Sequence, residues 1–358
     1  MTKNVKHEYL DIYRALGIFA VIIIHVTSFP MDQLEDETFQ HFFYMFFNYA
    51  SHFAVPSFLF LSGIVLFYNY VKRDREGENW VLHFYKKRLL NILVPYLIWS
   101  FFYFICVQLI NDTNIFFNIK TYFINLATGK NYTHLYYFVI ILQLYILFPL
   151  FLKLVISSDL IRKKFVFLAV IVQIVFFLIN KWFIGINQTG SMFITYFLHF
   201  CVGAYIGMEL DKVFRYLKSR SWLLGCIFIT SMLIYIFSEK IYYRWFTDLL
   251  PYKAYINFFI YYLFTLTASV ALLLISKYIF NYRKNLIVGI LGKIGNASFT
   301  IFLAHPIFLE LWRRHIISNY GEYYHYLTWM GGVVALACSW GLYILLKKTR
   351  WSWILIGK

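Results

Sequence analysis

Long apolar runs, separated by short polar segments, recur along the whole chain. Each is about 20 residues long, the length that a helix needs to cross roughly 30 Å of hydrocarbon. The pattern predicts an all-α fold, a polytopic membrane bundle of about ten spanning helices in a single domain over residues 1–358. The predicted spans lie near residues 10–29, 42–71, 86–110, 135–156, 165–184, 192–209, 221–240, 256–280, 294–312 and 327–347.

Composition supports the same class of protein. Hydrophobic residues make up 61% of the chain and charged residues only 14%, with a mean hydropathy of +0.63, whereas a soluble domain is roughly half apolar. A cleaved signal peptide is the alternative for the first run, but no small-residue cleavage site follows it. The cysteines all lie inside apolar runs, where they predict packing rather than disulfides or a metal site: Cys106, Cys201, Cys226 and Cys338.

The net charge of +16 is explained by topology. If the N-terminus is cytoplasmic, the predicted inside segments carry 23 basic residues and the opposite loops carry eight. The positive-inside rule then places both termini in the cytoplasm. The basic balance therefore predicts contact with anionic membrane lipid, or with a phosphorylated ligand, and no nucleic-acid partner.

The first apolar run, "YLDIYRALGIFAVIIIHVTSF", carries two ionisable residues, Arg14 and His25. On a helix that turns about 100° per residue they project from one face, about 16 Å apart along the axis. Arg14 lies near the inner end, where its guanidinium can reach the lipid headgroups. His25 lies beyond the middle of the membrane, where an unpaired polar group costs several kcal/mol, so it is predicted to face the bundle interior.

A histidine in that setting is either a hydrogen-bonded packing residue or a functional one. Removal from water disfavours the charged imidazolium, and a neutral imidazole suits a general base. His52, His199 and His305 also lie inside predicted spans. Because ionisable residues in membranes usually mark function, several of them in one bundle favour a site.

A basic cluster, Lys86, Lys87 and Arg88, opens the third predicted span in "FYKKRLLNILVPYL". One interpretation is a topogenic signal on the cytoplasmic side. The other is a donor-binding site, because clustered cations at the mouth of a cavity can hold the phosphates of coenzyme A.

Taken together, these stretches resemble acyltransferase family 3, the integral membrane O-acyltransferases, in particular its short members such as the staphylococcal modifiers or exporters of poly-N-acetylglucosamine. "YLDIYRALGIFAVIIIHV" looks like the family's opening span, whose paired arginine and histidine are Arg14 and His25 here. "PSFLFLSGIVLF" is similar to the second-span signature and contains Ser62. "THLYYFVIILQLYILFPLF" and "GNASFTIFLAHPIFL" resemble later motifs and carry His134 and His305.

"KKRLLNILVPYL" is similar to the family's basic third-span motif, with one departure. The family has three arginines where this chain has Lys87, Arg88 and Asn91, so one positive charge is missing. No fused extracytoplasmic esterase-like domain is expected either.

The resemblance implies a multi-pass protein of the cell membrane, a bacterial plasma membrane, with no tightly bound cofactor and no metal. It implies transfer of an acetyl or succinyl group from cytoplasmic acyl-CoA to a hydroxyl of a cell-envelope glycan. His25 and Arg14 would be catalytic, Lys86, Lys87 and Arg88 would bind the donor, and His305, Ser62 and His134 are further site candidates. Two alternatives stay open: a polysaccharide exporter or flippase without acyl transfer, and a structural partner in a polysaccharide synthase complex.

Overall fold

The computed structural model of the chain describes residues 8–71, 80–110, 118–245 and 247–357. Within these ranges the regular structure is helical and no strand is present. Three of the basic residues predicted to face the cytoplasm, in 72–79, and the first part of the loop predicted to be external, in 111–117, lie outside the described residues. The contacts group the chain into two compact units, which we call unit 1 (Met1–Phe58 with Asp211–Gly341) and unit 2 (Leu59–Leu210 with Leu342–Lys358). The single domain expected over 1–358 stays a prediction.

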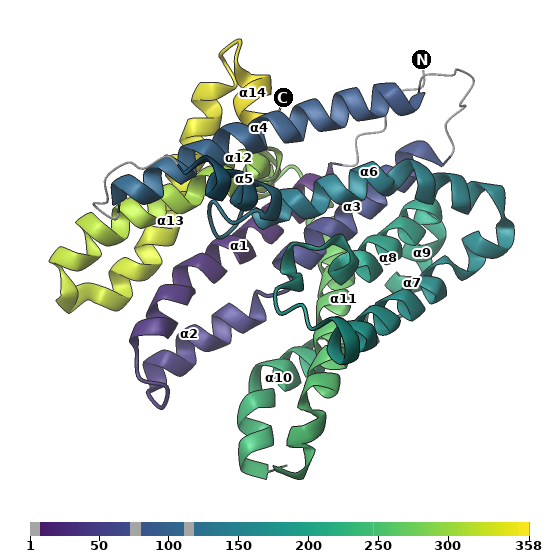
Figure 1. The fold of residues 1–358 in the computed structure, drawn as a ribbon, viewed down its shortest axis with the longest axis horizontal. Helices are drawn as coiled ribbons and strands as arrows, with labels where there is room; N and C mark the ends of the chain where they lie inside the picture. The colour runs from purple at the N-terminus through teal and green to yellow at the C-terminus, as the bar shows by residue number, and fades with distance from the viewer. Residues whose placement is uncertain (1–7, 72–79, 111–117, 246, 358) are drawn as a thin grey trace. The chain divides into compact units, whose positions relative to one another are not determined.

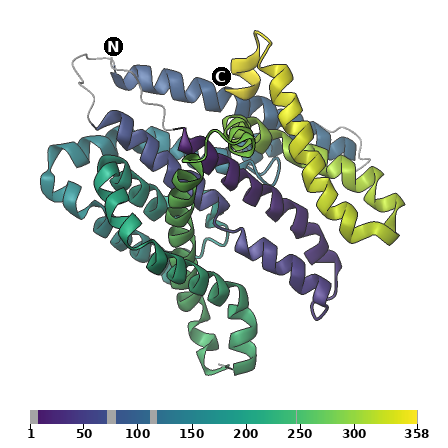
Figure 2. The same ribbon diagram turned by 180° about the vertical axis from the view of Figure 1, so that it is seen from behind.

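Unit 1 is built around the first helix, α1, which packs against α12, α2 and α11. Figure 1 shows α10 and α11 side by side as a helical hairpin, and Figure 2 shows the same hairpin from behind. The helices of unit 1 are α1 (Tyr9–Gln33), α2 (Phe39–Ala50), the start of α3 (Ala54–Tyr70), α9 (Leu210–Ser219), α10 (Ser221–Trp245), η4 (Thr247–Tyr252), α11 (Lys253–Phe280), α12 (Leu286–His315), η5 (Ile317–Asn319), η6 (Gly321–Tyr323) and most of α13 (Tyr324–Leu346).

The contact between α1 and α12 depends on a glycine. A Cβ atom added at Gly295 would overlap the backbone carbonyl of Asp11, so the two backbones touch at this point. The adjoining helix α11 satisfies its buried hydroxyls internally: Thr265, Ser269 and Ser276 each donate to the carbonyl four residues earlier, at 2.6 to 2.7 Å. This back-bonding lets polar residues face an apolar interior without a desolvation penalty.

Unit 2 holds the remaining helices. They are the rest of α3, α4 (Trp80–Ile110), α5 (Ile119–Thr128), α6 (Tyr136–Ser157), α7 (Asp159–Ile179), η1 (Asn180–Ile184), η2 (Thr189–Ser191), η3 (Phe193–Tyr196), α8 (Phe197–Met208) and α14 (Ser352–Ile356). Backbone contact between α3 and α8 again requires glycine, because a Cβ at Gly63, Gly203 or Gly207 would overlap a carbonyl of the facing helix. Near the C-terminus, α14 packs on α4, where Trp99 Nε1 donates to the Leu355 carbonyl at 3.0 Å.

Among the described residues, nine helical segments are long and apolar enough to span a membrane, which confirms a polytopic all-α fold. The span predicted over 192–209 differs from the rest. It consists of a short helical segment, Phe193–Met208, followed after a bend of 103° by α9. Twelve residues of α8 cover only about 18 Å, so the segment is either a broken tenth span or a re-entrant one. Glu209 lies at the bend and pairs with Arg162 of α7 at 2.6 Å.

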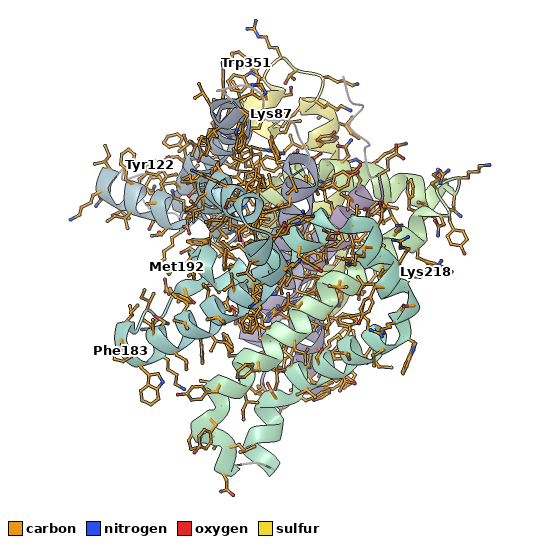
Figure 3. All side chains as sticks on the ribbon, turned by 90° about the vertical axis from the view of Figure 1, so that its right-hand side faces the viewer. Lys87, Tyr122, Phe183, Met192, Lys218 and Trp351 are labelled. Atoms are coloured by element: carbon orange, nitrogen blue, oxygen red, sulfur yellow. The ribbon has the colours of Figure 1, made fainter. Side chains whose placement is uncertain are left out.

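Large apolar side chains, both aliphatic and aromatic, are exposed along the spans, as expected where a helix faces lipid. Phe183, at the end of the α7 segment, is 85% exposed and projects away from the protein in Figure 3.

Candidate active site

Two histidines predicted from separate motifs lie against each other in unit 1. His25 of α1 and His305 of α12 have ring centroids 5.0 Å apart and ring planes inclined by 58°. His305 is fully buried, whereas His25 is half-buried. Two charged imidazolium rings at this distance would repel each other, so the pair is suited to holding at most one extra proton. Sequence spacing could not predict this contact, because 279 residues separate the two histidines.

The orientation of the His305 ring follows from its backbone neighbour. His305 Nδ1 lies 2.9 Å from the carbonyl oxygen of Ile301. A carbonyl only accepts, so Nδ1 carries the hydrogen, and in the neutral ring Nε2 is the acceptor. The next residue, Pro306, has no N–H for the carbonyl four residues earlier, so α12 lacks one backbone hydrogen bond next to this histidine.

Arg313 of α12 also belongs to this site, although the sequence pattern assigned it to an external loop. Its guanidinium donates to the backbone carbonyl of His25 and lies 5.3 Å from the Phe29 ring centroid. Glu310 lies 3.9 Å from Arg313 and 2.9 Å from Arg314. The sequence signal that could have found this group is the acid three and four residues before two arginines, the spacing of helical ion pairs.

A chain of hydrogen bonds holds the outer part of α1 in place next to His25. Asn48 of α2 donates to the hydroxyls of Thr27 and Ser28 at 2.9 and 3.2 Å. Its side-chain oxygen lies 2.9 Å from His52 Nε2, and His52 Nδ1 lies 2.7 Å from the Tyr235 hydroxyl of α10. Because Asn48 uses its amide nitrogen on α1, its oxygen must accept from His52, which makes Nδ1 of the neutral His52 ring an acceptor for Tyr235.

Arg14 is not part of this cluster. It lies on α1 eleven residues before His25, about 16 Å along the helix axis, and pairs with Asp11 at 2.6 Å. The Arg14 side chain is 32% exposed and that of Asp11 is 13% exposed. The ion pair within one helix turn fixes the guanidinium near the start of α1.

The basic cluster of unit 2 is positioned by α4. Lys86 and Lys87 are exposed, and Figure 3 shows Lys87 at the surface. Arg88 is half-buried, with its guanidinium carbon 5.9 Å from the Tyr145 ring centroid. Its Nε is buried and makes no hydrogen bond within the described residues. Such a guanidinium has donor capacity left for an anionic group.

The other two predicted site residues also lie in unit 2. Ser62 is half-buried on α3, one residue before the glycine that contacts α8. His134 is buried just before α6, with ring centroids 5.0 Å from Tyr103 and 5.7 Å from Tyr132. Neither residue belongs to the unit that holds the histidine pair. In the described part of the chain, no group of three or more His, Cys, Asp or Glu side chains could hold a metal ion.

The fold and this site define a multi-pass membrane protein with a histidine pair between two of its helices. The family described as "Acyltransferase domain", acyltransferase family 3, matches residues 7–346. Because that match covers nearly the whole chain, the protein belongs to this family of membrane acyltransferases. No curated protein and no solved structure matches the chain, so the likeness to the staphylococcal members stays a prediction.

Proposed function

We propose that this protein moves an acetyl or succinyl group from cytoplasmic acyl-CoA to a hydroxyl of a cell-envelope polysaccharide or glycan, in a bacterial plasma membrane. The observation that carries the proposal is the contact between His25 and His305, with the Arg313 guanidinium on the backbone of His25. Membership of the acyltransferase family supports the reaction class. The donor and the acceptor are inferred from the resemblance.

In the proposed reaction His25 takes the proton of the acceptor hydroxyl as general base. The hydroxyl oxygen then attacks the thioester carbonyl, so that a C–O bond forms, the C–S bond breaks and the proton passes to the coenzyme A sulfur. His305 supports the His25 ring in the neutral form that can accept a proton. Arg313 fixes the backbone at His25 and contributes positive charge close to where negative charge develops on the carbonyl oxygen.

The donor is proposed to be a substrate rather than a tightly bound cofactor. Lys86, Lys87 and Arg88 would bind its phosphates, and the buried Nε of Arg88, which makes no hydrogen bond within the described residues, supports this role. Arg14 would contribute positive charge on the donor's route, although its pairing with Asp11 leaves only part of that charge uncompensated. A polysaccharide synthase complex is the proposed setting in which the acceptor glycan reaches the enzyme.

The test is acyl transfer by the purified protein in liposomes, with isotope-labelled acetyl-CoA or succinyl-CoA outside the acceptor compartment and a glycan acceptor inside. His25→Gln keeps a similar volume and a hydrogen-bonding group but cannot take up and release the proton. We expect transfer to fall by about 10² to 10⁴. His315→Gln, at the exposed end of α12, is the matched control and should retain the parent rate.

Near-parent transfer by His25→Gln would remove this residue from catalysis. Glycan crossing the bilayer without any acylation, by the parent protein, would favour the exporter instead. The acyl content of envelope glycans with and without the protein gives the same comparison in cells.

A further inference from the structure

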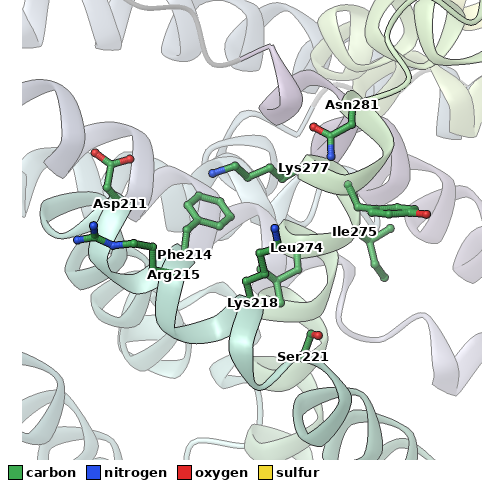
Figure 4. Close-up of a pocket in the computed structure, with 10 residues that line it drawn as sticks. Asp211, Phe214, Arg215, Lys218, Ser221, Leu274, Ile275, Lys277 and Asn281 are labelled. Carbon is green, nitrogen blue, oxygen red and sulfur yellow. The ribbon is translucent and has the colours of Figure 1, made fainter.

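A basic pocket lies in unit 1 between the amphipathic helix α9 and the C-terminal part of α11. Its volume is about 710 Å³. Figure 4 shows three cationic side chains around it, Arg215 and Lys218 from α9 and Lys277 from α11. Phe214, Leu274 and Ile275 provide apolar walls. None of the residues placed in catalysis or donor binding lines this pocket.

The three cations lack ion-pair partners within the described residues, since no salt bridge there involves them. Asp211 is the one acidic residue of the lining, which leaves the pocket with a net positive charge. The Lys277 ammonium lies 3.7 Å from the centroid of the Phe214 ring and 6.0 Å from that of Tyr9. Contact with the faces of these rings orients the ammonium without neutralising it, so it stays available to an anion.

The sequence of α9 places this pocket at a membrane surface. Leu210 and Phe214 are buried on one face, while Lys212, Arg215 and Lys218 are exposed. A short amphipathic helix with basic residues on its polar face lies in the plane of the interface. The positive-inside pattern predicts that this interface is the cytoplasmic one, where anionic lipids create a negative surface potential.

We propose that the pocket between α9 and α11 binds the headgroup of an anionic phospholipid, with its phosphate among Arg215, Lys218 and Lys277. The apolar walls suit the adjoining glycerol and upper acyl chain. Asp211, Ser221 and Asn281 offer hydrogen-bonding groups to headgroup hydroxyls. The site is additional to the proposed acyl transfer and does not depend on it.

Lipid bound at this site would restrict the movement of the start of α1. The Tyr9 ring at the start of α1 packs edge-on against Phe214, with centroids 5.8 Å apart, and Lys277 lies over both rings. A bound phosphate would hold Lys277 and α9 in place and so fix the end of the helix that carries His25.

The experiment measures equilibrium binding of a fluorescent short-chain phosphatidylglycerol to the purified full chain in neutral detergent. The phosphatidylcholine analogue has the same phosphate but no net charge, because its choline ammonium neutralises the phosphate, and it should bind much more weakly. Each basic residue near a lipid surface contributes about a fivefold change in affinity. We therefore expect Lys218→Gln to weaken binding about fivefold, and the triple variant Arg215→Gln, Lys218→Gln, Lys277→Gln about 100-fold.

Lys212→Gln is the matched control, because it removes a charge from the same helix at an exposed position outside the pocket. It should change the affinity less than twofold. Equal weakening by Lys212→Gln and Lys218→Gln would overturn the proposal in favour of diffuse surface charge. If the triple variant unfolds, the comparison of these two single variants still decides.

Coenzyme A is the other source of phosphate and forms a separate arm of the experiment. We expect coenzyme A to leave the lipid probe bound, and the triple variant to keep the parent affinity for coenzyme A. Displacement of the probe by coenzyme A, together with loss of coenzyme A binding in the triple variant, would overturn the lipid assignment. Parent-like lipid affinity in the triple variant would overturn it as well.

Discussion

The two units of this protein use polar side chains in different ways. In unit 1, buried and half-buried polar groups from separate segments contact one another: His25 contacts His305, and Asn48, His52 and Tyr235 form a continuous chain. In unit 2, helices α3 and α8 meet through glycines, and the basic cluster of α4 projects largely to the surface. A neutral polar cluster between helices suits proton transfer, whereas partly exposed cations suit binding of an anion.

The largest expected effect concerns the segment through which the chain passes from unit 2 to unit 1. This segment either crosses the membrane or does not, so the labelling result is all or none. The chain crosses between the units at the bend between α8 and α9. If α8 completes a tenth span, both termini are cytoplasmic. In a variant without its native cysteines, Lys120→Cys on α5 should then react with a membrane-impermeant maleimide in intact cells, and Lys347→Cys should not.

Lysis gives the control, because both positions should react once the membrane is opened. Strong labelling of Lys347→Cys in intact cells would mean that α8 re-enters the membrane without crossing it. It would also move α9, with its basic pocket, to the outer surface.

Hydrophobic pattern alone predicted most of this architecture, because the length of an apolar run is set by membrane thickness. It could not predict the bend after α8. Residues 192–209 are apolar almost throughout, and the bend depends on how the chain turns at Glu209 beside Arg162.

The candidate site was predictable only in part. The opening motif and the late motif supplied His25 and His305 separately, while their contact arises from the packing of α1 on α12 at Gly295. Arg313 was missed because a charge at the end of an apolar run is ordinarily a loop residue. The opening motif suggested Arg14 as a catalytic residue, whereas Asp11, three residues before it, has the spacing of a helical ion pair and holds Arg14 near the start of α1.

Buried histidines provide the next test, one from each unit. His305 in unit 1 and His199 in unit 2 are both fully buried. If the contact with His25 matters, His305→Gln should lower kcat by about 10- to 100-fold, as loss of support for a general base would, and leave the KM for acyl-CoA unchanged. His199→Gln should leave kcat within about twofold.

The measurement is steady-state acyl transfer by monodisperse protein. Equal losses of kcat in the two variants would mean that replacing a buried histidine disturbs folding in general, and that the contact of His305 with His25 has no separate effect on catalysis. An unchanged kcat in His305→Gln would contradict its role as a positioning residue for His25.

Substitutions at the close helix contacts are expected to have a smaller effect on kcat, and each unit offers one such substitution. Gly295→Ala forces α1 and α12 apart, and Gly203→Ala forces α3 and α8 apart. Overpacking of this kind costs about 1 to 3 kcal/mol, so both variants should lower the free energy of unfolding. Only Gly295→Ala should also reduce kcat beyond the loss of folded protein, because it displaces the helix that carries His25. Equal kcat values per folded molecule would separate the α1–α12 contact from catalysis.

The smallest expected effect concerns the basic cluster of unit 2. Replacing Lys87 and Arg88 with glutamine removes two charges but leaves a polar side chain that can still form hydrogen bonds. Each cation at the phosphates of an exposed donor contributes modestly, so we expect the KM for acyl-CoA to rise about tenfold with kcat nearly unchanged. Lys163→Gln with Lys164→Gln, on exposed positions of α7, removes the same charge from the same unit and should leave KM at the parent value.

High salt should weaken donor binding in the parent more than in the variant, since screening acts on the charges that the variant lacks. If both double variants raise KM equally, the effect is long-range attraction of the donor by unit 2 as a whole. If neither does, the cluster serves topology, and donor binding belongs to residues outside it.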